Sequence, residues 1–122
     1  MLLFDDKDEP AARTTDEVGG DAPAILCAAC RRRVTTTGAR IEMMGLHAHT
    51  CVNPAGLSYR IGCFAIVVGC EIVSNPSSEW SWFPGWRWQV EQCGGCRTHL
   101  GWKFIRNDSA FHGLILDRLT EA

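Results

Sequence analysis

Apolar and polar residues alternate along several short stretches of the chain, and no stretch has the longer period of an amphipathic helix. Residues 86–91 and 101–106 alternate in this way, which predicts two half-buried strands, with Glu91 among the polar positions of the first. Residues 57–73 are rich in β-branched and aromatic residues and contain two interrupting glycines, which predicts two strands or one bulged strand. The pattern therefore predicts a mainly β fold.

Shorter segments complete this picture. Residues 24–30 begin with a short apolar run, and residues 35–43 predict a short strand with turns. Residues 111–119 predict either a last strand or a short helix. Loops or tight turns are predicted where Pro, Gly, Asn and Ser gather, at residues 52–56, 74–78 and 84–85.

The first 22 residues differ in composition from the rest. They hold seven acidic and two basic residues and almost no large apolar side chain after Phe4, so they are predicted to form a disordered acidic tail. Residues 23–122 then form one small domain. The basic run Arg31–Arg33 is interpreted as a solvated loop, because phosphate-driven binding normally needs a broader basic face. No nucleic acid partner is expected.

No targeting segment and no membrane span are expected either. Two aspartates follow directly after Met1–Phe4, and the segment has neither a basic region nor a long apolar region. The sequence therefore predicts a cytoplasmic protein, in which the seven cysteines serve as metal ligands or core residues rather than disulfides.

Two Cys-x-x-Cys pairs, Cys27/Cys30 and Cys93/Cys96, predict one structural zinc ion in a Cys₄ site. The glycines of Cys93-Gly94-Gly95-Cys96 are expected to allow a tight turn with positive φ. A redox-active Cys-x-x-Cys is the alternative, but such a motif usually opens a helix, and neither pair precedes a helical pattern.

The other three cysteines and two histidines are not expected to bind metal or take part in catalysis. Cys51, Cys63 and Cys70 have apolar neighbours and are predicted to be inert core residues. His47 and His49 could be spare metal ligands, but four sulfurs already fill the shell, so they are predicted to lie on the surface.

All five tryptophans lie between residues 80 and 102. If the second cysteine pair is the tip of a hairpin, Trp88 and Trp102 stand nearly opposite each other, with Phe104 on the face of Trp102. Trp82 could add a third aromatic wall, and the amides of Trp80-Ser81-Trp82 could supply hydrogen bonds. An aromatic cage of this kind binds a flat ring with polar edges or an alkylated cation. The same residues could equally be ordinary members of the hydrophobic core.

Several motifs together resemble the CULT domain family of cereblon, over about residues 25–120. They are SEWSWFPGWRW at 78–88, CGGC at 93–96, THLGWKF at 98–104, VNPAG at 52–56 and FHGL at 111–114. The chain resembles the stand-alone bacterial members of this family most, and it has no room for the ligase-adaptor-binding region of eukaryotic cereblon.

This resemblance implies a β-tent fold, in which two antiparallel sheets are pinned by a Cys₄ zinc site. It also implies a tri-tryptophan pocket for glutarimides such as thalidomide, for related cyclic imides and for uracil-type rings. By position, the ligand-binding residues are Asn53, Pro54, Trp80, Ser81, Trp82, Trp88, Trp102 and Phe104. Trp80 stands where the animal family members have histidine, which puts any side-chain contact there in doubt.

Three functions follow as hypotheses. The first is a non-enzymatic module that binds a cyclic imide, free or carried by a protein or peptide. The second is a reader of methylated ammonium groups, with Glu79 adding negative charge near the aromatic cage. The third is an enzyme similar to the methionine sulfoxide reductases, which share the β-tent fold. That enzyme would need Cys63 or Cys70 as nucleophile, and neither has an adjacent base in the sequence.

Overall fold

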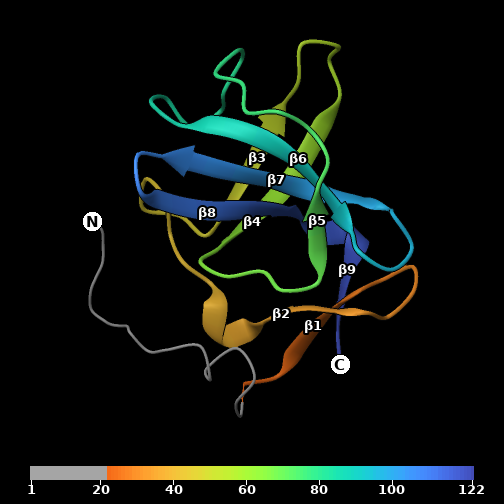
Figure 1. The fold of residues 1–122 in the computed structure, drawn as a ribbon. Helices are drawn as coiled ribbons and strands as arrows, with labels where there is room; N and C mark the ends of the chain where they lie inside the picture. The colour runs from red at the N-terminus through yellow and green to blue at the C-terminus, as the bar shows by residue number, and fades with distance from the viewer. Residues whose placement is uncertain (1–21) are drawn as a thin grey trace.

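The computed structural model describes residues 22–122, which form short β-strands and two single-turn 3₁₀ helices (Figure 1). The strands are β1 (Ala24–Cys27), β2 (Arg33–Thr36), β3 (Ala48–Val52), β4 (Ser58–Phe64), β5 (Cys70–Ile72), β6 (Arg87–Cys93), β7 (His99–Arg106), β8 (Ser109–Ile115) and β9 (Leu119–Glu121). The 3₁₀ helices are η1 (Thr37–Ala39) and η2 (Leu116–Arg118). The predicted disordered tail lies outside the described residues, apart from Ala22.

The strands form two sheets in which every neighbouring pair is antiparallel. A three-stranded sheet has the order β2-β1-β9, and a six-stranded sheet has the order β3-β4-β8-β7-β6-β5. The predicted mainly β fold of two antiparallel sheets is therefore confirmed. Residues 57–73 contain two strands, β4 and β5, and the last segment contains a strand, a 3₁₀ turn and a further strand.

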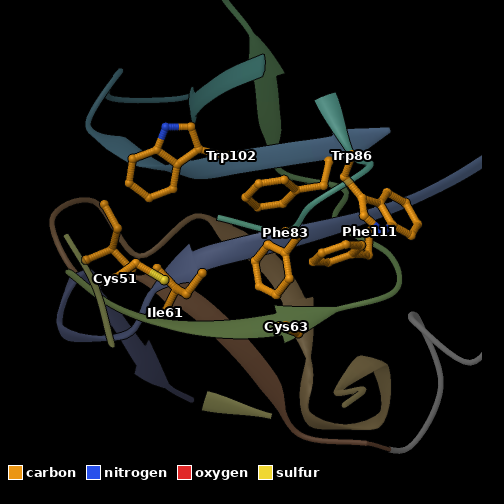
Figure 2. Close-up of a cluster of buried hydrophobic side chains, with 9 residues drawn as sticks. Cys51, Ile61, Cys63, Phe83, Trp86, Trp102 and Phe111 are labelled. Carbon is orange, nitrogen blue, oxygen red and sulfur yellow. The ribbon is translucent and has the colours of Figure 1, made fainter. Parts of the chain in front are cut away.

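The six-stranded sheet separates two apolar clusters, because side chains alternate between its faces. On β8, Leu114 belongs to one cluster and Ile115 to the other. The first cluster also takes Ile25 and Val34 from the three-stranded sheet, so it lies between the two sheets. The second cluster covers the other face and is mostly aromatic; Figure 2 shows it as a row of rings with Trp102 at one end.

The turn predicted at Pro84-Gly85 closes the second cluster. The amide of Trp86 donates to the carbonyl of Phe83 over 3.0 Å, and Gly85 has φ +89°, as a type II turn requires at its third position. This turn directs Phe83 and Trp86 into the core, where both are buried.

The register of the β6–β7 hairpin differs from the prediction. Trp88 lies opposite Phe104, and Trp102 lies opposite Val90, so the two tryptophans share a face but stand diagonally. One cause is the turn, which closes between Cys93 and Thr98 rather than between the two cysteines. The other is a bulge that adds one residue on β7, between the partners of Glu91 and Gln92.

Glu91 is buried rather than solvent-facing, contrary to the alternation. It is 1% exposed, and one of its carboxylate oxygens lies 2.8 Å from Nδ1 of His112 on β8. Gly101 stands opposite Glu91 on the strand between them, and a Cβ there would approach the carbonyl oxygen of Gly113 to 2.0 Å. The buried side chain of Glu91 therefore has a hydrogen-bond partner in His112, which the sequence pattern could not identify as its neighbour.

Candidate functional site

Four cysteines from both sheets meet at one end of the domain, where the β1–β2 and β6–β7 turns lie (Figure 1). Their sulfurs lie within 4.8 Å of one another; Cys27 to Cys96 and Cys30 to Cys93 are each 3.6 Å apart. A tetrahedral zinc ion with Zn–S bonds of about 2.3 Å separates its sulfurs by about 3.8 Å. The cluster therefore has the donor set and spacing to hold one zinc ion.

The two turns that carry these cysteines have the same backbone structure. In each, the amide of the first cysteine donates to the carbonyl five residues later, over 2.9 Å from Cys27 and 2.8 Å from Cys93. The residue after the second cysteine, Arg31 or Arg97, has φ +67° in both turns. The expectation of positive φ at Gly94-Gly95 is wrong, because the left-handed residue follows the second cysteine.

The thiols of the cluster differ in their affinity for protons. Burial raises the pKa of Cys27 to about 11, whereas hydrogen bonds from the hydroxyl and amide of Thr98 lower the pKa of Cys96 to about 6. Without a cation, four thiolates at this spacing would repel one another strongly. A divalent metal removes that repulsion by binding the deprotonated sulfurs.

Gly69 joins the two turns, a role that the sequence analysis missed. Its carbonyl accepts hydrogen bonds from the amide of Gly94 over 2.8 Å and from Nε of Arg32 over 3.1 Å. A Cβ at this position would approach the carbonyl oxygen of Arg33 to 2.1 Å. The sequence signal was a glycine between two strands, which indicates close backbone approach but not which segments meet.

Two of the predicted cage tryptophans are in direct contact. The rings of Trp82 and Trp102 have centroids 4.7 Å apart and planes at 79° to each other. Nε1 of Trp82 donates to the carbonyl of Val52 over 2.9 Å, which ties the loop before β6 to the end of β3. Within residues 22–122, Trp88 forms no aromatic pair; its Nε1 donates to the carbonyl of Glu79 over 2.7 Å.

The loop between Ser78 and Trp82 presents free backbone groups beside these rings. Trp80 has φ +60°, which is unusual for a bulky residue, and its side chain is 71% exposed. Ser81 Oγ donates to the carbonyl of Phe83 and so fixes the end of the loop. Within residues 22–122, the amides of Trp80 and Trp82 donate to no other group.

Asn53 and Pro54 lie next to the residue that holds Trp82. The side-chain oxygen of Asn53 accepts from the amides of Ala55 and Leu57, over 3.0 and 2.9 Å, so its own loop already uses this atom. Pro54 is exposed. The hydrogen bond between Trp82 and Val52 thus brings this loop next to Trp82.

Trp86, Phe104 and Trp102 are all buried members of the aromatic core cluster. Phe104 is 1% exposed and stacks on Phe111 at a centroid distance of 4.9 Å; Trp86 packs on Phe111 from another side. In Figure 2, Trp86 and Trp102 lie at opposite ends of the aromatic cluster. Phe104 faces the same side of the sheet as Trp102, as the alternation predicted.

A second layer of side chains behind Trp102 was not anticipated. Tyr59 and His99 both contact its ring edge-on, with centroids 5.2 and 4.7 Å away. Arg118 donates from Nη1 to the carbonyl of His99 over 2.8 Å, and its guanidinium carbon lies 5.9 Å from the ring centre of Tyr59. Burial lowers the pKa of His99, which favours its neutral form.

The remaining cysteines lack the properties of a catalytic nucleophile. Cys51 and Cys63 are buried, as predicted, and burial raises their pKa values to about 11 and about 12. Cys70 is half-buried rather than buried, and burial together with the charge of Glu91 raises its pKa above the ordinary value. These thiols stay protonated near neutral pH and are therefore weak nucleophiles.

His47 and His49 are half-buried, whereas the sequence predicted exposed positions. His47 Nδ1 lies 3.0 Å from the carbonyl oxygen of Ile41, and its ring meets Phe64 edge-on at 5.2 Å. His49 makes the same kind of ring contact with Phe83. Neither histidine belongs to the cysteine cluster.

The chain is similar in sequence to curated proteins from several animals. No protein-family model matches it. It is 34% identical to protein cereblon from Xenopus tropicalis over 89 residues, which cover 70% of this chain and 20% of that protein. It is 32% identical to protein cereblon from Gallus gallus over 110 residues, or 81% of this chain and 25% of that protein. The chain thus spans about a quarter or less of the length of these curated relatives.

A similar match is found in a fish. The chain is 30% identical to protein cereblon from Danio rerio over 83 residues, which cover 66% of this chain.

Between residues 22 and 122, no helix is long and apolar enough to cross a bilayer.

Proposed function

Because this chain is a cereblon-like CULT domain, we propose that it is a small-molecule binding module whose aromatic cage takes an uncharged cyclic imide or uracil-type ring. In this proposal Trp82, Trp88 and Trp102 are the walls, and a zinc ion on the four cysteines is structural. The observation that carries it is the perpendicular contact between Trp82 and Trp102, on the sheet face that Trp88 also occupies.

The chemistry of the loop beside the cage fits the edge of an imide. An imide offers two carbonyl acceptors and one N–H donor in a plane. The amides of Trp80 and Trp82 have no partner within residues 22–122, so they can donate to such carbonyls. Stacking would supply most of the affinity, and these hydrogen bonds would orient the ring.

The charges around the cage favour a neutral ring over a methylated ammonium group. Arg118 places a positive charge 5.9 Å from the ring of Tyr59, which in turn contacts Trp82 and Trp102. Glu79, the candidate for an attracting charge, is exposed, and its carbonyl accepts from Trp88. A cation would therefore enter a site with a fixed positive charge behind it.

An enzymatic role is not supported by the thiols. The reductase hypothesis needs Cys63 or Cys70 as a thiolate, and burial raises the pKa of both. We therefore propose binding without catalysis, in the cytoplasm, where free thiols persist. The ligand would be a free cyclic imide or one carried at the end of a protein or peptide.

A tryptophan-fluorescence titration tests this proposal. Glutarimide and uracil are expected to quench the emission in a saturable way, whereas a trimethylammonium compound is not. The quenching should disappear in Trp82→Ala and persist in Trp86→Phe, which alters a core tryptophan instead. Saturable quenching by the ammonium compound alone would overturn the proposal in favour of the reader hypothesis.

A further inference from the structure

A series of backbone and side-chain contacts joins the first cysteine turn to the proposed aromatic cage. The amide of Ala28, within that turn, donates to the carbonyl of Arg118 over 3.0 Å. The guanidinium of Arg118 then donates to the carbonyl of His99 over 2.8 Å. The ring of His99 meets the ring of Trp102 edge-on, at 85° and 4.7 Å. Three direct contacts thus lead from the cysteine cluster to one wall of the proposed site.

His99 reaches Trp102 only because β7 carries a bulge. Residues three apart on a regular strand point to opposite faces. Here Glu91 pairs with Gly101 and Gln92 pairs with His99, so Leu100 is left without a partner. Leu100 turns into the cluster between the sheets, and His99 shares the face of Trp102. Bulges commonly re-aim a side chain next to a functional site in this way.

The orientation of the His99 ring is fixed from several sides. Its Nε2 lies 3.1 Å from the carbonyl oxygen of Gly101, and the ring of Tyr59 lies 6.4 Å away at 69°. Tyr59 in turn touches Trp102 edge-on at 5.2 Å. Two rings therefore meet the indole of Trp102 edge-on, which limits how far it can rotate.

We propose that His99, Tyr59 and Arg118 are positioning residues that hold Trp102 perpendicular to Trp82 and link this wall to the first cysteine turn. The inference rests on the proposed function, since it assigns these residues to the same cage. They need not touch the ligand. Their effect is to keep the empty cage in the geometry that a ring requires, so that little ordering is needed on binding.

The test uses the full chain labelled with 5-fluorotryptophan, which gives Trp102 its own ¹⁹F signal, assigned with Trp102→Phe. In His99→Ala we expect the Trp102 signal to shift or broaden without ligand, and glutarimide affinity to fall about three- to tenfold. His99→Phe retains the ring edge and is expected to restore both readouts. Arg118→Met, which keeps the carbonyl that Ala28 uses, should shift the same signal.

The matched control is His49→Ala, which also removes a half-buried histidine edge, but from Phe83. It should leave the Trp102 signal unchanged. An unchanged Trp102 signal in both His99→Ala and Arg118→Met would overturn the inference, as would equal changes in the control. If the unaltered chain binds no imide, the proposed function fails, while the ligand-free signal still decides the role of these residues. If His99→Ala does not fold, His99→Phe and Arg118→Met carry the test.

Discussion

The cysteine cluster and the proposed aromatic cage share the β6–β7 hairpin, but their residues are brought together in different ways. The cluster consists of two short turns with the same hydrogen bonds and the same φ of +67° after the second cysteine. The residues of the proposed cage come from separate elements, with Trp82 in a loop, Trp88 on β6 and Trp102 on β7, and the side chains behind Trp102 include residues of β4 and η2.

This difference determines what each region needs from the rest of the molecule. A turn of six residues fixes its own two sulfurs, so the fold only has to bring two such turns together. The proposed cage has no local unit of this kind. The position of each of its tryptophans depends on the register of the strands, on a bulge or on a hydrogen bond to another element. Substitutions at the cysteine end should therefore also weaken ligand binding at the proposed cage, whereas substitutions in the proposed cage should leave the cysteine end unchanged.

The largest effect is expected from Cys93→Ser. Loss of one ligand should remove most of the bound zinc and about 4 kcal/mol of stability, which lowers Tm by roughly 20 °C in a domain of this size. Glutarimide binding should weaken as well, since Cys93 ends the strand that carries Trp88. Metal analysis, thermal unfolding and titration measure the three effects.

The control for this variant is Cys70→Ser, which alters the residue opposite Cys93 on β5 but lies outside the cluster. It should retain one zinc ion. A folded, zinc-free Cys93→Ser protein with unchanged glutarimide affinity would show that the two regions are independent.

Gly69→Ala should destabilise the cysteine end without removing a ligand. Its Cβ would come within 2.1 Å of the carbonyl oxygen of Arg33, so the backbone must shift, at a cost of about 1–3 kcal/mol. Urea unfolding measures this loss. Gly95→Ala is the control, because its Cβ would meet the flexible side chain of Arg32 at 3.2 Å. Equal stability of the two variants would contradict the role of Gly69 in joining the turns.

Trp82→Ala should act on binding much more than on stability. The side chain is half-buried and would form one wall, so its loss is expected to reduce glutarimide affinity by about 30-fold or more. Trp86→Ala should show the opposite balance, with a loss of about 3–5 kcal/mol in stability, because it opens the core. Calorimetric titration and chemical unfolding of both variants separate the effects. A similar loss of stability in both would mean that Trp82 is a core residue.

The smallest effect is expected from Trp80→Gly. Glycine adopts φ +60° without strain, and the indole is 71% exposed, so stability should stay the same or rise by about 1 kcal/mol. If the contact with the ligand is through the backbone, affinity should change less than about threefold. Trp80→Val, with a β-branched side chain at this φ, should lower stability instead. A tenfold loss of affinity in Trp80→Gly would assign the indole itself to the binding site.

Several features of the fold could be predicted from the sequence because they depend on neighbouring residues. The alternation at residues 101–106 identified β7 and placed Trp102 and Phe104 on one face, and Pro84-Gly85 identified its turn. Strands β3 and β9 were missed, since β3 is partly polar and β9 has only three residues. The fate of Glu91 was also missed, because its partner His112 is two strands away.

The mainly β class, the four cysteines of one cluster and the placing of Trp88 and Trp102 on one face of a hairpin could all be predicted from the sequence. Each of these follows from short-range spacing: a period of two along a strand, or two residues between cysteines. The pairing of Trp88 with Phe104 and the contact between the rings of His99 and Trp102 became visible only in the folded protein. One bulge and one longer turn shift the register of the whole hairpin, and a shift of one residue changes which side chains stand opposite each other.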